Sequence, residues 1–330
     1  GLLSIDDVNL APQALQSNAY PYANPLVSDD GEMFVYLSDN NSESVWDTRT
    51  SYAKKNAGLY EDEGAIDSAD GFGDSAVSFD GNKSFAAAAW VRQCDKVEKD
   101  AGDEINDADI AIMMNGTEIY TSVYNGTNWV TEKLTENNSP DLAPQVATNG
   151  SKAIVAWRSV YANDASIPTE FQGKDTVLYR IYDGTSWKPV KTLYNGISGA
   201  VMGISVDMLP DGTSLVSYVI DTANNNNITD YEIVCAIVNP EGEIISNIRL
   251  TNDTYLDENP QITTVNFGDS SDYRFILGWH RQDEDGSDIR LAVINSNGDL
   301  TTDMADSLKT VTASGKNAVG SNFRFAKGAQ

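Results

Sequence analysis

A repeated strand–turn–strand phrase constrains the fold of this chain more than any other feature of its sequence. Each copy opens with a short strand, passes an Asp-Gly or Asn-Gly type turn, and continues into a strand that ends in an aromatic residue. A polar loop of variable length follows, then an Asp and a further strand that ends at a Gly-containing turn. The clearest copies begin at Ala143 and Asn259. Because Asn-Gly and Asp-Gly favour two-residue hairpin turns, we expect neighbouring strands to be antiparallel.

The spacing of the copies identifies the architecture. The first turns recur about every 60 residues, which is typical of four-stranded propeller blades, at Gly31, Gly81, Gly150, Gly212 and roughly Gly268. An immunoglobulin-type sandwich needs about 100 residues and seven strands per unit. No segment shows a sustained helical period with caps. We therefore predict an all-β fold, a β-propeller of about five four-stranded antiparallel blades with a partial sixth as an extension.

The blades divide the chain as one propeller domain spanning residues 1–330. We place them at about 20–70, 71–138, 139–196, 197–253 and 254–312. Residues 313–330 are expected to begin a further blade or to supply a closing strand, because 321–326 has the pattern of a first strand. The stretch 2–10 is a candidate outer strand that helps to close the ring.

The charge of the chain excludes several partners. Its 49 acidic and 22 basic residues give a net charge of −27. Nucleic-acid binding needs clustered Lys and Arg, and so does binding to an anionic membrane surface. No run of 18 apolar residues is present, so we predict no membrane insertion. The two cysteines are too few for a disulfide scaffold.

A family likeness follows from the repeat. The pattern Pro-x-Val/Ile, Asn/Asp-Gly, Val-x-Trp, Asp-Ile, Gly over about residues 20–300 resembles the repeats of secreted bacterial β-propeller proteins. The phrase at 182–187, echoed at 124–129, is loosely similar to the Asp-box hairpin of sialidase-like propellers, although the full Ser-x-Asp-x-Gly-x-x-Trp form is missing. The resemblance implies an extracellular or bacterial cell-surface module of a larger protein. The start at Gly1, without Met, agrees with a piece of a longer chain.

Two recurring residue types have structural explanations. Aromatic residues end the second strand of each unit, and at a repeated position they are expected to pack in the core rather than to stack on sugars: Tyr36, Trp90, Trp157, Tyr218 and Trp279. An Asp precedes or opens the third strand and is expected to accept backbone N–H bonds there: Asp47, Asp109, Asp175, Asp230 and Asp288.

The loops between the second and third strands gather on one face of a propeller, the usual place for binding. Two of them are acid-rich, and closely spaced carboxylates around a Gly can bind Ca²⁺. The candidate metal ligands are Asp103, Asp107, Asp283, Asp285 and Asp288. Neither loop matches an EF-hand, and a merely solvated acidic loop is the alternative. No nucleotide cofactor is expected, because no phosphate-binding or dinucleotide fingerprint occurs.

Three arginines follow the second-strand aromatics and are the candidate ligand-binding residues, Arg92, Arg158 and Arg281. Stacking on the neighbouring aromatic is their structural alternative. With a single histidine, His280, a Ser-His-Asp site is poorly served, and we nominate no catalytic residue. The function expected first is a non-catalytic extracellular module that binds a glycan or a protein. The alternatives are a glycoside hydrolase or sialidase-like enzyme, which needs only two carboxylates, and a structural adhesin spacer.

Overall fold

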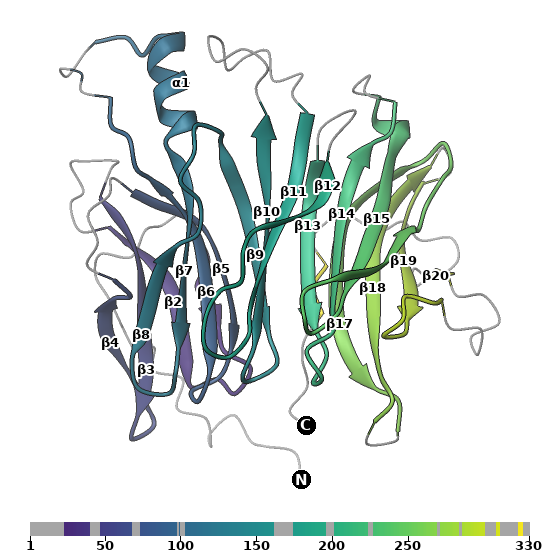
Figure 1. Cartoon of the computed structure of the whole chain (residues 1–330), viewed down its shortest axis with the longest axis horizontal. Coiled ribbons are helices and arrows are strands. Elements are labelled where there is room, and N and C mark those ends of the chain that lie inside the picture. The colour runs from purple at the N-terminus through teal and green to yellow at the C-terminus, as the bar shows by residue number, and fades with distance from the viewer. Residues whose placement is uncertain are drawn as a thin grey trace, which may run out of the picture.

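The computed structural model describes residues 23–39, 47–67, 73–97, 99, 103–161, 174–195, 201–223, 227–268, 271–283, 286–300, 308–310 and 323–325. Within these residues the strands form five separate four-stranded sheets, and the paired strands are antiparallel. The sheets follow one another in chain order, from purple to yellow in Figure 1. The prediction of an all-β propeller with five four-stranded blades is therefore confirmed.

The first two blades contain strands β1 to β8. The first comprises β1 (Leu26–Val27), β2 (Met33–Asp39), β3 (Thr48–Asn56) and β4 (Leu59–Ala65). The second comprises β5 (Gly73–Gly81), β6 (Ala86–Gln93), β7 (Thr117–Tyr124) and β8 (Trp129–Lys133), with helix α1 (Asp107–Asn115) between β6 and β7.

The remaining three blades repeat the arrangement. The third comprises β9 (Asp141–Thr148), β10 (Ala153–Tyr161), β11 (Lys174–Tyr182) and β12 (Lys191–Asn195). The fourth comprises β13 (Val201–Met208), β14 (Ser214–Asp221), β15 (Tyr231–Val238) and β16 (Ile244–Arg249), with the 3₁₀ turn η3 (Ile228–Asp230) before β15. The fifth comprises β17 (Leu256–Asn266), β18 (Tyr273–Asp283), β19 (Gly286–Ile294) and β20 (Leu308–Thr310).

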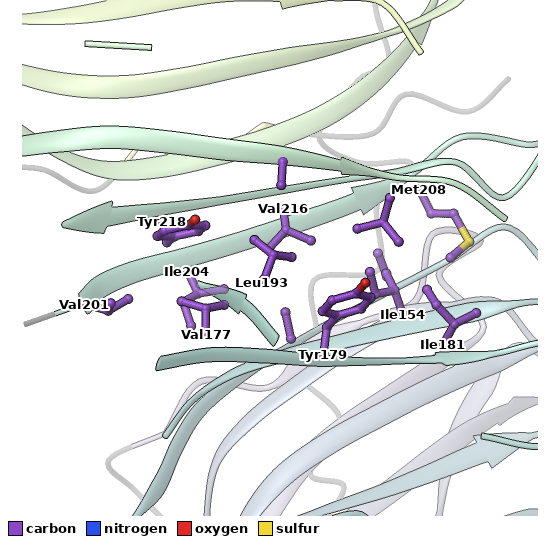
Figure 2. Close-up of a cluster of buried hydrophobic side chains, with 14 residues drawn as sticks. Ile154, Val177, Tyr179, Ile181, Leu193, Val201, Ile204, Met208, Val216 and Tyr218 are labelled. Atoms are coloured by element: carbon purple, nitrogen blue, oxygen red, sulfur yellow. The ribbon is translucent and has the colours of Figure 1, made fainter. Parts of the chain in front are cut away.

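The core lies between the faces of successive blades. Figure 2 shows one such interface, in which side chains of the third blade, such as Ile154 and Tyr179, face side chains of the fourth, such as Val216 and Tyr218. The five second-strand aromatics are all buried, and Trp90, Trp157 and Trp279 are at most 1 % exposed. Their predicted role in packing is therefore confirmed. Burying such large apolar surfaces between blades is the main favourable contribution to folding.

A β-bulge recurs in the first strands of the last four blades. Ala76, Ala143, Gly203 and Asn259 have φ between 48° and 55°, in the left-handed region. In each blade the pairing of the first strand with the second shifts register at this point. Left-handed backbone is costly for Ala and more easily adopted by Gly and Asn, and bulges re-aim the side chains that follow them. The residues just after the bulges are therefore held in a defined direction.

Helix α1 corrects one expectation. We expected Asp109 to open the third strand of the second blade, but it is the third helical residue of α1, at the upper edge of the sheets in Figure 1. The Asn106 side chain accepts a bond from the Asp109 N–H, and the Asp109 carboxylate accepts one from the Asn106 N–H. This capping box stabilises the first turn. The third strand is β7, and a turn at Gly126 leads from it into β8.

The predicted row of third-strand aspartates is confirmed in part. Asp47 and Asp230 directly precede β3 and β15 and Asp175 is the second residue of β11, whereas Asp288 is the third residue of β19. Asp109 and Asp175 do accept backbone N–H bonds, from Asn106 and Val201. Their partners differ, so the row has no common structural role.

Residues 323–325 are the only described part of the segment from 311 to 330, and they form no strand. The rings of Phe323 and Phe325 lie so close to Gly278 of β18 that an added Cβ there would stand 3.0 Å from each. Most of the expected closing segment, and all of 2–10, lie outside the described residues. Among the described helices, none has the length and apolarity that crossing a membrane requires.

Candidate functional site

A pocket of about 470 Å³ lies between the first strands of the five blades. Its walls contain residues of β1, β5, β9, β13 and β17, together with Arg324. The first strand of every blade contributes to the walls, and the first strands of successive blades contact one another, so the pocket lies on the propeller axis. A pocket of about 300–1,000 Å³ is the size that usually holds a small ligand. We call it the axial pocket.

The bulges shape the axial pocket. Its lining includes the residues that follow them, namely 77–80, 145–147, 204–207 and 260–262. Gly203 also lines the pocket, and a Cβ there would stand 3.0 Å from the Pro260 ring. Strained backbone that recurs beside a pocket is an observation that points to function.

Two carboxylates line this pocket, Asp80 from β5 and Asp207 from β13. Asp80 Oδ2 accepts a 2.7 Å bond from the Thr148 N–H of β9, which fixes its side chain. Asp207 is 2 % exposed, and its Oδ1 accepts from the Met208 N–H. The other polar groups of the lining include the amides of Gln145 and Gln261 and the guanidinium of Arg324. Such groups can bind the hydroxyls of a small polar ligand.

A second group of acidic residues lies at the junction of the fourth and fifth blades. Carboxylate oxygens of Glu232, Asp253 and Asp257 lie within 4.8 Å of one another. Glu232 and Asp257 are at most 1 % exposed. Burial raises the pKa of Asp257 to about 6, although the hydrogen bond from Trp279 and the charge of Arg281 both lower it. Among the described residues this is the only group of three acidic, His or Cys side chains close enough to share one metal ion.

The predicted arginines are distributed over three blades. Arg92 is 1 % exposed and bonds to Asp74 and Asp67, so it is a buried structural residue. Arg158 pairs with Asp175 at 2.8 Å. Arg281 pairs with Asp253 at 3.1 Å and lies over the Tyr255 ring.

The three arginines also differ in the side of the strand on which they lie. Arg92 and Arg281 hold equivalent positions two residues after a Trp, whereas Arg158 directly follows its Trp and points to the other side of its strand. Each of the three already has an anionic partner in or beside its own blade.

Among the described residues of the two predicted acidic loops, no three carboxylates lie close enough to share one metal ion. Asp103 and Asp107 are exposed, and Asp107 begins α1. The strands β18 and β19 extend to Asp283 and Gly286, which pair with each other, so most of the expected loop at 281–287 belongs to strands. Asp288 therefore lies on β19 and pairs with Arg290 at 2.9 Å. Asp285 and the Asp283 side chain lie outside the described residues.

Sequence reasoning missed both groups of carboxylates. Asp80 and Asp207 come from strands of different blades, and only the bulges show that they face one pocket. The junction group had a sequence signal, because Thr251-x-Asp253 followed by Asp257 repeats the spacing of Thr135-x-Asn137 followed by Asp141.

No protein-family model and no curated protein matches this chain. Several solved structures are similar to it. A protein of unknown function from Dyadobacter fermentans is 15% identical over 91% of this chain and 84% of its own, with a TM-score of 0.49. The α-L-arabinofuranosidase Arb93A from Fusarium graminearum is 12% identical over 87% and 79%, with a TM-score of 0.47. An endo-arabinase from Bacteroides thetaiotaomicron is 13% identical over 78% and 87%, with a TM-score of 0.39.

These comparisons correct the function that we expected first. We expected a non-catalytic binding module, with a glycoside hydrolase as the alternative. The similar structures that have a stated activity are mainly glycoside hydrolases, the class of our alternative. At such low identity the likeness concerns the fold, so the chemistry has to be argued from the residues of this chain.

Proposed function

We propose that this protein is a glycoside hydrolase and that its active site is the axial pocket. The observation that carries the proposal is the pair of carboxylates, Asp80 and Asp207, that line one pocket of ligand size. Hydrolysis of a glycosidic bond needs two carboxyl groups. One protonates the leaving oxygen, and the other attacks the sugar or activates a water.

The surroundings of the pair suit a carbohydrate. Side-chain amides of Gln145, Asn259 and Gln261 can both donate to and accept from sugar hydroxyls, and Arg324 adds a cationic donor. The strands that carry the two carboxylates are rigid, because neighbouring first strands are linked by side chains. Ser78 accepts from the Val146 N–H and Ser205 from the Ile262 N–H. Catalytic groups on rigid elements are positioned more accurately than groups on loops.

The proposal includes an extracellular or cell-surface location and a glycan partner. Its support is the acidic composition, with a net charge of −27, which suits a soluble exported protein. The same charge disfavours polyanionic substrates, since the protein would repel them. Neutral sugars such as arabinosides, the substrates named for several similar structures, are the first class to examine.

The test is a hydrolysis assay of the purified chain on a panel of aryl glycosides and polysaccharides, including aryl α-L-arabinofuranosides, arabinan and sialosides. Asp80→Asn and Asp207→Asn are each expected to lower kcat by about 100- to 10,000-fold. The Asn side chain keeps an acceptor for the bond from Thr148, so the fold is expected to survive. Asp107→Asn, a change at an exposed residue of α1, is the control.

Azide provides the second arm of this test. With an aryl glycoside, azide can replace a missing nucleophile, and it can also attack a glycosyl-enzyme intermediate without help from a base. The two roles are then assigned by the product. The variant that lacks a nucleophile is expected to give a glycosyl azide of inverted anomeric configuration, and the variant that lacks the acid/base group one of retained configuration. Full activity in both variants, or no hydrolysis by the unmodified chain on the whole panel, would overturn the proposal.

A further inference from the structure

The junction of the fourth and fifth blades holds three carboxylates that come together from three elements. Glu232 lies near the start of β15, Asp253 in the connection after β16, and Asp257 near the start of β17. The Asp253 N–H donates to Glu232 Oε1, and the Trp279 indole N–H donates to Asp257 Oδ1. These bonds fix the side chains of the two buried members and leave one oxygen of each to be explained.

Those two remaining oxygens are buried acceptors without a donor. Neither Glu232 Oε2 nor Asp257 Oδ2 has a hydrogen-bond partner among the described residues, and both atoms are shielded from solvent. The Thr251 hydroxyl, which accepts from the Ile233 N–H, lies beside Asp257 and lowers the pKa of that carboxyl, but it leaves both of these oxygens unpartnered. A buried carboxylate oxygen without a donor or a cation is costly, and native proteins rarely keep one. Something that the polypeptide does not supply is therefore expected between them.

The junction of the second and third blades shows the same construction in a complete form. There Glu118 accepts from the Asn137 N–H and from the Thr135 hydroxyl. Asp141 accepts from the Trp157 indole N–H at Oδ1 and from the Asn137 side-chain amide at Oδ2. Every carboxylate oxygen of this pair has a donor.

Asp253 stands where the complete junction has Asn137. The replacement removes the amide that would donate to Asp257 and adds a third carboxylate. Arg281, in the position of Ser159, pairs with Asp253 at 3.1 Å and offsets the added charge. Arg249 lies 3.6 Å from Glu232 Oε1 but is 45% exposed at its side chain. Neither arginine supplies a donor to the two buried oxygens.

We propose that Glu232, Asp253 and Asp257 bind a Ca²⁺ ion that links the fourth and fifth blades. Ca²⁺ takes oxygen ligands at about 2.3–2.6 Å and tolerates irregular geometry, so it can bridge oxygens that are up to about 5 Å apart. The three carboxylates lie within that span, at 4.8 Å or less. The Asp253 side chain is 31% exposed, which leaves room for water ligands and a path of entry. The site is separate from the axial pocket and does not depend on the proposed hydrolase activity.

The experiment compares the full chain with Asp253→Asn after EDTA treatment and dialysis. Titration with CaCl₂ is followed by calorimetry and by melting temperature, at pH 7.5 and about 150 mM salt, which screens weak binding to the acidic surface. The unmodified chain is expected to bind one Ca²⁺ and to melt at a higher temperature when it is bound. Asp253→Asn is expected to weaken binding at least about tenfold and to abolish the shift. Because Asn137 already occupies the equivalent place, this variant is expected to fold.

Two further arms separate the site from its alternatives. Tb³⁺ luminescence excited through tryptophan reports binding near Trp279, and it should be displaced by Ca²⁺ and be lost in Asp253→Asn. Glu136→Gln, which removes an acid with an 87% exposed side chain elsewhere, should keep both signals. The proposal fails if the unmodified chain shows no saturable Ca²⁺ binding, which would leave a shared proton as the occupant. It also fails if Asp253→Asn binds Ca²⁺ as tightly as the unmodified chain.

Discussion

Asn137 and Asp253 hold the same place at two blade junctions, where each donates its backbone N–H to a buried glutamate. The side chains then differ in one respect. The Asn137 amide also donates to Asp141 at 2.8 Å, whereas the Asp253 carboxylate has no proton to give to Asp257. A second contact differs as well, because the Thr135 hydroxyl donates to Glu118 Oε2, whereas Glu232 Oε2 has no donor. Two missing donors thus separate a self-sufficient junction from one that needs a further cation or proton.

Asp253→Asn is expected to stabilise the metal-free protein. The new amide can donate to Asp257 Oδ2, and a buried carboxylate cluster loses one negative charge. We expect the free energy of unfolding to rise by about 1–2 kcal/mol in EDTA. Urea denaturation measures the change. A loss of stability in EDTA would show that the pairing of Asp253 with Arg281 matters more than the missing donor.

Asn137→Asp is the reciprocal change. It removes the donor to Asp141 and brings a third carboxylate to a junction where Ser159 stands in place of Arg281. We expect it to lower the free energy of unfolding by about 2–4 kcal/mol. The same denaturation experiment tests this, with Asn137→Ser as a control that removes the amide without adding charge. Equal losses in the two variants would contradict the electrostatic part of the argument.

The fold was predictable because its determinants are local. Turn glycines such as Gly150 and Gly212, with φ of 89° and 96°, and strand-ending aromatics such as Trp157 repeat in the sequence at blade spacing. Helix α1 was missed because it has no apolar face, Asp109 being its only buried residue. Its capping box, Asn106 and Asp109, was the available signal.

The axial pocket was not predictable from the same features. Asp80 and Asp207 lie in different blades, and which face of a strand each occupies depends on a bulge that shifts the alternation by one residue. The bulge residues Ala76 and Ala143 are ordinary in sequence, and nothing in their identity predicts a positive φ. The arginines could have been separated from sequence alone, because Arg92 and Arg281 stand two residues after a Trp and Arg158 one residue after, which puts Arg158 on the other side of its strand.

The carboxylates at the junction of the second and third blades are expected to contribute to the pH dependence of stability. Burial raises the pKa of Glu118 and of Asp141 above their ordinary values. The folded state therefore holds more protons than the unfolded state above the ordinary carboxyl range, so stability falls as the pH rises through that window. In Glu118→Gln the fall between about pH 4.5 and 7 should be shallower.

The control for this titration is a neighbouring residue. Glu136 has an 87% exposed side chain, and Glu136→Gln should leave the slope of stability against pH unchanged. Urea denaturation at four pH values across the window gives the slopes. If stability plotted against pH ran parallel for Glu118→Gln and the unmodified chain, Glu118 would have the same pKa in the folded and the unfolded state.

Arg92 is expected to matter for stability and not for ligand binding. It is nearly fully buried between Asp74 and Asp67, at 2.7 and 3.1 Å. Arg92→Met would leave the buried Asp74 carboxylate without its main partner and should cost about 3–5 kcal/mol. The exposed pair of Lys83 and Glu32 provides the comparison, and Lys83→Met should change stability by at most about 0.5 kcal/mol. A weaker affinity for glycan in Arg92→Met, without loss of stability, would restore a binding role for this residue.

The bulge beside the axial pocket can be tested at Gly203. Its φ is 55°, and a Cβ would stand 3.0 Å from the Pro260 ring, so Gly203→Ala adds both backbone strain and a close contact. We expect it to lower the free energy of unfolding by about 1–3 kcal/mol. Ala143→Gly, at the equivalent bulge of the third blade, relieves the same backbone strain and should be neutral or slightly stabilising. If Gly203→Ala cost no more than Ala143→Gly, the bulge would be easily deformed, and the pocket could not rely on it to hold Asp207 in place.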